Sequence, residues 1–138
     1  MSEQVGPGRG ALGPIAQIHV SVSDLERSVA FYRDVLGLEH LFTVPGRPMA
    51  FFDAFGVRLY LGVPEDAAFH SRPLLYYRVE DVEATFEAVV GRGAEPIHPP
   101  HLVHREMHNG VVSELWMAFV ADPDGNPIGF MTERAINP

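Results

Sequence analysis

The sequence predicts an α+β fold of two similar βαβββ modules, which together form a curved mixed sheet around a cavity. A strand-then-helix pattern occurs twice, and each copy is followed by three short apolar stretches that turn residues separate. The length of 138 residues suits one domain with a large core. We expect a flexible tail over residues 1–13 and a single domain over 14–134, with modules at about 14–64 and 73–134.

The first module opens with a strand and a helix. Over residues 15–22 apolar and polar side chains alternate, so if the apolar set packs under the helix, His19 must point the other way, into the cavity. Ser23 and Glu26 fit an S-x-x-E capping box at the start of the helix. Gly37 can then supply a left-handed stop at its end.

The second module repeats this order. An alternating stretch over 75–79 precedes a helical run over 82–91. Asp81 corresponds to Asp24 of the first module, and the residues on either side of them correspond at the same spacing along the chain. The remaining strands are expected at 41–44, 49–52 and 57–62 in the first module and at 96–98, 114–120 and 127–132 in the second. Residues 122–126, DPDGN, predict a tight turn before the last strand.

Composition excludes several classes of function. Ten basic and eighteen acidic residues give a net charge of -8, so nucleic acid is not an expected partner. The absence of cysteine excludes disulfides, thiolate metal sites and a cysteine nucleophile. No apolar run is long enough to span a bilayer or to act as a signal peptide, so we expect no membrane partner and a cytoplasmic location.

Two sets of motifs resemble the glyoxalase/bleomycin resistance/dioxygenase superfamily, also called vicinal oxygen chelate proteins. The first joins VSDL at 22–25 to FYRDVLGL at 31–38, and the second leads from WMAF at 116–119 into DPDGN at 122–126. The resemblance runs from about Gly13 to Glu133. It implies a small-molecule cavity formed by two modules, and a homodimer.

Metal-dependent members of this superfamily hold one divalent ion with a side chain from the first and last strand of each module. The matching positions here are His19, Tyr60, Tyr76 and Gly129. Histidine is a usual ligand, whereas a neutral phenol is a poor one and glycine has no side chain to offer. We therefore expect no full metal site and no required cofactor.

The same positions predict a ligand-binding cavity. His19, Tyr60 and Tyr76 should converge as hydrogen-bonding groups, and Gly129 should leave room for a ligand or for Met131. Plainer roles stay open, because a histidine can be satisfied by a neighbour on the sheet and tyrosines are common in strands.

A histidine-rich segment connects two strands of the second module. If a short helix begins near His101, it places His101, His104 and His108 on one face, a spacing that can gather imidazoles around an ion. The interpretation that we prefer is a lid, in which His101, His104 and Arg105 meet an anionic ligand in a pH-dependent manner.

Glu114 and Trp116 share one face of a predicted strand, which either lines the cavity or faces outward. In the cavity, Trp116 would contact the ligand and Glu114 could be a general base with a raised pKa. A surface glutamate is the plainer interpretation, and we favour it.

Two functions follow. The first is a protein that binds a small organic molecule without chemistry, as bleomycin-binding members do; the incomplete ligand set favours it. The alternative is a lyase or isomerase that acts next to a carbonyl, with Glu114 or a histidine as base and a weakly bound divalent ion at His19.

Overall fold

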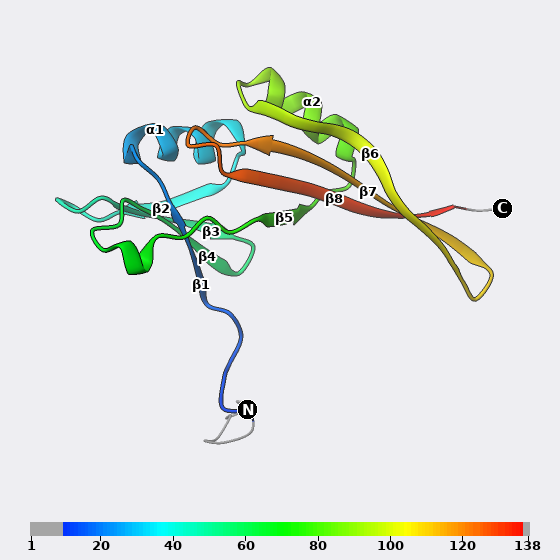
Figure 1. Ribbon diagram of the computed structural model, residues 1–138, viewed down its shortest axis with the longest axis horizontal. Coiled ribbons are helices and arrows are strands. Elements are labelled where there is room, and N and C mark those ends of the chain that lie inside the picture. Colours follow the sequence, from blue (N-terminus) through cyan, green and yellow to red (C-terminus); the bar gives the residue numbers. More distant parts are fainter. Residues whose placement is uncertain (1–9, 137–138) are drawn as a thin grey trace.

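The computed structural model describes residues 10–136, which form two open four-stranded sheets (Figure 1). The first sheet contains β1 (Gln17–Ser21), β2 (Glu39–Thr43), β3 (Met49–Ala54) and β4 (Val57–Gly62), in the order β1-β4-β3-β2. The second contains β5 (Leu75–Arg78), β6 (Glu95–His108), β7 (Val111–Ala121) and β8 (Pro127–Ile136), in the order β5-β8-β7-β6. In each sheet the first strand runs parallel to the last and the other pairs are antiparallel. The predicted duplication of a βαβββ module is confirmed.

The helices lie on the same side of the two sheets (Figure 1). They are α1 (Leu25–Ala30), which continues as a π-helical turn η1 (Phe31–Val35), and α2 (Val82–Gly91); a short 3₁₀ turn, η2 (Ala67–Phe69), lies between the modules. Buried side chains of both modules form one continuous hydrophobic cluster, which includes Val20 and Leu61 of the first sheet and Val120 and Ile128 of the second. Burial of this shared apolar surface holds the modules together.

Equivalent aspartates begin the two main helices. The carboxylate of Asp24 accepts a hydrogen bond from the Arg27 amide at 3.1 Å, and that of Asp81 accepts one from the Ala84 amide at 2.9 Å. Both residues have extended backbones, with φ of -137° and -136°, as N-cap residues do. The predicted capping box of Ser23 and Glu26 is therefore wrong by one residue, because Asp24 already satisfies the amide of the first turn.

The histidine-rich segment is a strand and not a helix or a loop. β6 runs without interruption through residues 95–108 and pairs antiparallel with β7. Three register shifts interrupt the pairing between Pro96 and His104, around the prolines that cannot donate to a neighbouring strand. The expected short helix from His101 is wrong, since β7 supplies partners for the backbone that a helix would otherwise have to satisfy internally.

The DPDGN turn also joins the two modules. Gly125 has a φ of 82°, as a tight turn requires. The buried Tyr32 hydroxyl donates to the Asp122 carboxylate at 2.8 Å, and Arg72 Nε donates to Asn126 Oδ1 at 2.7 Å. The Asn126 side chain in turn donates to the Ser21 carbonyl at 3.2 Å. Polar contacts from three segments of the chain thus meet at one turn.

The predicted tail lies mostly outside the described residues, because residues 1–9 are not among them; residues 10–13 are exposed and belong to no helix or strand. Within residues 10–136, no helix has both the length and the apolar character that a bilayer crossing requires.

Candidate functional site

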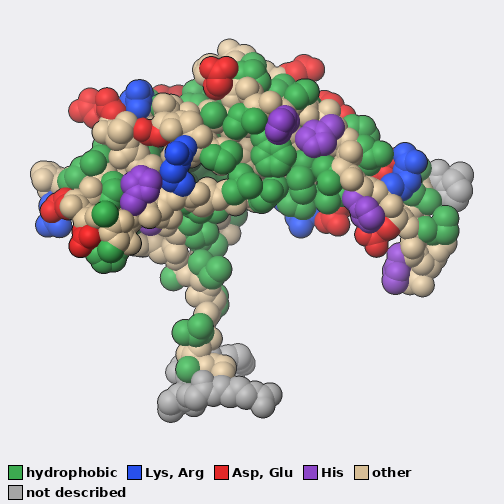
Figure 2. All heavy atoms as spheres, in the orientation of Figure 1, with side chains coloured by type: hydrophobic (Ala, Val, Ile, Leu, Met, Phe, Trp, Pro, Cys, Tyr) green, Lys and Arg blue, Asp and Glu red, His purple; other side chains and the backbone are tan. Residues whose placement is uncertain are grey.

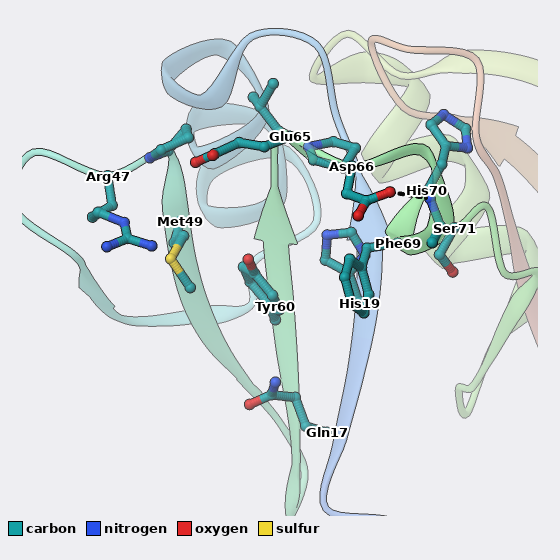
Figure 3. Close-up of a pocket in the computed structure, with 14 residues that line it drawn as sticks. Gln17, His19, Arg47, Met49, Tyr60, Glu65, Asp66, Phe69, His70 and Ser71 are labelled. Carbon is teal, nitrogen blue, oxygen red and sulfur yellow. Dashed lines mark hydrogen bonds between the residues drawn. The ribbon is translucent and has the colours of Figure 1, made fainter.

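A cavity of about 670 Å³ lies on the face of the first sheet opposite α1 (Figure 3). Its volume falls in the range of small-molecule sites. Strands β1, β3 and β4 supply the floor, and the segment after β4, residues 63–71, supplies a second wall. The uncharged aromatic, sulfur-containing and amide side chains that line it include Gln17, His19, Met49, Tyr60, Phe69 and His70.

Strand pairing brings His19 and Tyr60 together. They are direct partners in the parallel pair of β1 and β4, so both side chains project from the same face of the sheet. Their ring centroids are 4.5 Å apart (Figure 3). Because Val20 on the next position is buried in the core, the predicted division between a core face and a cavity face of β1 is confirmed.

Gly62 allows the tyrosine ring to occupy its place. A Cβ atom added to Gly62 would lie 2.8 Å from a ring carbon of Tyr60 and 2.9 Å from its hydroxyl oxygen. Such separations are shorter than van der Waals contact, so the ring could not lie over a larger residue. The absence of a side chain at position 62 therefore permits the position that Tyr60 takes at the cavity.

An aromatic row continues from the cavity across the sheet. Tyr60 stacks on Phe51 with ring centroids 5.0 Å apart, and Phe51 contacts Phe42 at 4.8 Å. The Arg58 guanidinium lies 5.4 Å from the centroid of Phe51, within the range of a cation–π contact. Tyr60 on the cavity floor is thus backed by further aromatic rings on the same sheet.

The electrostatics of the cavity favour a neutral imidazole at His19. Burial lowers the pKa of His19 below its ordinary value of 6.5, and the nearby His70 lowers it further, against hydrogen bonds with the backbone of Gly62 and Phe69 that raise it. Glu65, Asp66 and Arg47 add charges of both signs at the rim. A neutral imidazole both donates and accepts, so His19 can contact either kind of ligand group.

Segment 63–71 was not expected to contribute to the site. It begins its 3₁₀ turn at Asp66, whose carboxylate accepts a hydrogen bond from the Ala68 amide at 2.9 Å. The turn brings Phe69 to the wall of the cavity, and His70, which follows it, also lines the cavity (Figure 3). The sequence did contain an aromatic residue and a histidine in this linker. Their presence does not indicate which sheet the linker covers.

Tyr76 lies apart from His19 and Tyr60. It is the partner of Gly129 in the second sheet, packs edge-on against Phe119 with centroids 5.7 Å apart, and does not line the cavity of about 670 Å³. A Cβ added to Gly129 would lie 2.8 Å from the Tyr76 ring. The space at Gly129 is therefore filled by Tyr76, not left for a ligand or for Met131, which pairs with Met117 farther along β8.

The residues expected in a lid form part of the second sheet. His101 and His104 are exposed on β6, opposite Met117 and Leu115 of β7. The Arg105 guanidinium, through Nε, donates to Glu114 at 3.0 Å. Figure 2 shows histidine side chains at several separate places on this face of the molecule, with hydrophobic surface among them. In this chain the lid residues do not cover the cavity at His19.

Glu114 and Trp116 lie on the helix side of the second sheet. Trp116 packs against the hydrophobic core, and its Nε1 donates to Glu114 at 3.0 Å. Arg134 lies 5.0 Å from the centroid of the Trp116 ring and pairs with Glu83 of α2. Hydrogen bonds from Trp116 and Arg105 lower the pKa of Glu114. This lowered pKa is opposite to the raised pKa that the alternative role of Glu114 as a general base would need. The favoured interpretation of a surface glutamate does not hold either, because Glu114 is only 8% exposed.

The residues present do not fit a four-ligand metal site. His19 and Tyr60 lie side by side in the first sheet, and Tyr76 and Gly129 lie side by side in the second. Of these four, only the imidazole is a usual ligand for a divalent ion. In the part of the chain that the structure describes, no three histidine, aspartate or glutamate side chains are grouped so that they could hold a metal ion.

Comparison with known proteins places the chain in a family. Residues 14–130 match the family model of the glyoxalase/bleomycin resistance protein/dioxygenase superfamily. This match covers most of the chain, and the protein belongs to that superfamily.

Individual relatives are more distant. A metallothiol transferase FosB from Lysinibacillus sphaericus (strain C3-41) is 50% identical over 46 residues, which span 33% of this chain and 31% of the transferase. A solved structure of TnmS3, an antibiotic-binding protein from Streptomyces sp. CB03234, has a TM-score of 0.62 at 22% identity and covers 90% of this chain and 98% of its own. A lactoylglutathione lyase from Agrobacterium tumefaciens gives 0.62 at 21% identity, with 88% and 94% covered. At these identities the structures show a shared fold.

Proposed function

We propose that this protein binds a small organic molecule with a flat aromatic part in the cavity at His19. The observation that carries the proposal is a cavity of about 670 Å³ with His19 and Tyr60 on its floor and Phe69 on its opposite wall. Aromatic rings offer a large apolar contact area with two flexible torsions each, and stacked rings add about 0.5–1.5 kcal/mol beyond burial. Gln17 and His19 supply hydrogen bonds that orient the ligand.

Two features support binding without chemistry. The positions that hold a metal ion in other members carry a single ligand residue, His19. The structural relatives include a protein described as antibiotic-binding, TnmS3. Binding by stacking and a few hydrogen bonds needs neither a metal ion nor an ionisable base. The aromatic and hydrogen-bonding side chains of the cavity can provide both kinds of contact.

A fluorescent naphthalene sulfonate dye provides a direct test. We expect saturable binding that Tyr60→Leu weakens by about fivefold, because the leucine keeps an apolar side chain but cannot stack. Tyr76→Leu is the matched control, since it removes the same kind of ring from the other sheet. Equal losses from both variants, or none from Tyr60→Leu, would contradict the proposal.

The neutral imidazole of His19 favours a second candidate function, that of a lyase or isomerase. A histidine with a lowered pKa is available as a base near neutral pH, and His19 is exposed to the cavity. The test is deuterium exchange next to the carbonyl of a small 2-hydroxyketone, followed by NMR. Exchange that is lost in His19→Ala, with the fold intact, would support catalysis, and no exchange above that of buffer would leave binding as the function.

A further inference from the structure

A second hollow lies away from the His19 cavity, on the helix side of the molecule. It has a volume of about 370 Å³ and is bounded by the end of η1, the turn between β3 and β4, the strand β5 and one face of α2. Both modules therefore contribute to it. We call it the α2 cleft, and none of the residues that line it also lines the cavity at His19.

The wall from α2 is made of small residues. The cleft is lined on the α2 side by Ala84, Thr85 and Ala88. On the other side it is lined by Gly37 and the two leucines that flank it. Residues four apart lie on one face of a helix, so Ala84 and Ala88 form a single shallow strip. The short side chains leave a space that larger residues of the helix would have filled.

Phe55 stands at the edge of the cleft with little packing of its own. The residue is 88% exposed, and its backbone has a φ of 57°, a conformation that residues other than glycine rarely adopt. Contact of this ring with an apolar ligand would remove apolar surface from water, which is favourable. The ring is placed to cover a molecule that enters the cleft.

The charge of the cleft is opposite to that of the whole chain. Its charged lining residues are Arg78 and Arg92, and no acidic residue lines it, although the chain has a net charge of -8. Arg78 pairs with Glu133 at 3.1 Å. Arg92 Nε donates to the Val35 carbonyl at 2.9 Å, which holds that guanidinium in place without neutralising its charge. A small anion is therefore the favoured ligand.

We propose that the α2 cleft binds a small aromatic carboxylate, separately from the ligand of the His19 cavity. The ring contacts the alanine strip and Phe55, and the carboxylate pairs with Arg92. The two sites are independent, so the proposal does not rest on the function assigned to the cavity.

Benzoate is a probe with these features. Backbone amide NMR should show saturable shifts at Ala84, Thr85 and Ala88 at millimolar probe. Ala88→Leu should abolish them by filling the cleft; because Ala88 is exposed, this change should not impair folding. Glu87→Leu is the matched control, as it adds the same side chain to α2 outside the cleft.

The ion pair is tested by a further variant. Arg92→Gln should weaken benzoate binding by about tenfold, since it removes the charge. The proposal is overturned if shifts appear at the amides of His19 and Tyr60 instead, if no saturable shifts occur, or if Ala88→Leu and Glu87→Leu behave alike.

Discussion

Single hydrogen bonds between buried polar groups connect distant parts of this chain. The Tyr32 hydroxyl, on η1, donates to Asp122 in the turn before β8, and burial together with the neighbouring carboxylate raises the pKa of this tyrosine. The tyrosine thus remains a neutral donor at all ordinary pH values. Its spacing in the first helix predicted burial, but no local pattern in the sequence indicated that its partner lies ninety residues away.

Removal of the Tyr32 hydroxyl should destabilise the fold. We expect Tyr32→Phe to lower the free energy of unfolding by about 1–3 kcal/mol, because Asp122 loses a donor while it remains buried. Urea denaturation followed by circular dichroism measures the difference. Tyr76→Phe is the matched control, since its side chain is exposed, and a change below about 0.5 kcal/mol is expected there. Equal effects would show that the hydrogen bond contributes nothing specific.

Glu114 should make stability depend on acid pH. Its lowered pKa means that the folded chain binds this proton less tightly than the unfolded chain, whose carboxyl titrates near the ordinary value of 4.5. The resulting stabilisation is therefore present above that value and is lost as the pH falls through the lower folded pKa. Glu114→Gln should reduce the melting temperature near neutral pH and reduce its fall toward acid pH.

The comparison that isolates this effect is Glu87→Gln, on the exposed face of α2. It removes one carboxylate of equal charge that has no part in the contacts of Trp116 and Arg105. If the two variants lose the same amount of acid sensitivity, the effect belongs to net charge and not to the Glu114 contacts.

At the level of elements, the duplicated helix starts are the most regular feature. Asp24 and Asp81 have nearly the same backbone angles and the same hydrogen bond to the third amide of their helices. The matching of these aspartates was predictable from the sequence, because a cap is a local interaction among residues three apart. The choice between Ser23 and Asp24 was not, since both can cap and Asp124 takes the Ser23 hydroxyl.

The cap of α2 is open to a direct test. Asp81→Ala should lower the free energy of unfolding by about 1 kcal/mol, whereas Asp81→Asn should retain most of it, since an amide oxygen can also accept from the Ala84 amide. Thermal or urea denaturation gives the values. An asparagine variant as unstable as the alanine variant would mean that the negative charge, and not the hydrogen bond, stabilises the helix.

Strand β6 shows the limit of local patterns. Its prolines and histidines are typical of a polar connection, and nothing in their order alternates as a half-buried strand should. In the structure it is an edge strand whose residues are almost all exposed, so no apolar face is required of it. It is a strand because β7 runs beside it, and such pairing is a property of two segments, not of one.

At the scale of the whole molecule, the homodimer expected from the resemblance stays a prediction. Sedimentation velocity over a range of protein concentrations measures it directly: a dimer at micromolar concentration is the expected result, and a monomer throughout would contradict it. The second sheet carries an apolar surface at the exposed Tyr76 and the half-buried Phe119. Hydrogen exchange of the backbone amides near these residues can be measured in the same samples, to see whether dimer formation protects them.

The sequence by itself determined the two modules, their strand and helix order, and which face of β1 carries His19. These features depend on periodicity and capping among residues close in the chain, so they can be deduced without coordinates. The resemblance to the superfamily also led us to expect Tyr60 beside His19. Tertiary structure decided that Tyr76 lies apart from them and fills the space at Gly129, and that linker residues complete the cavity. Those outcomes depend on how two sheets and a linker pack in space, which is set by contacts between residues far apart in the sequence.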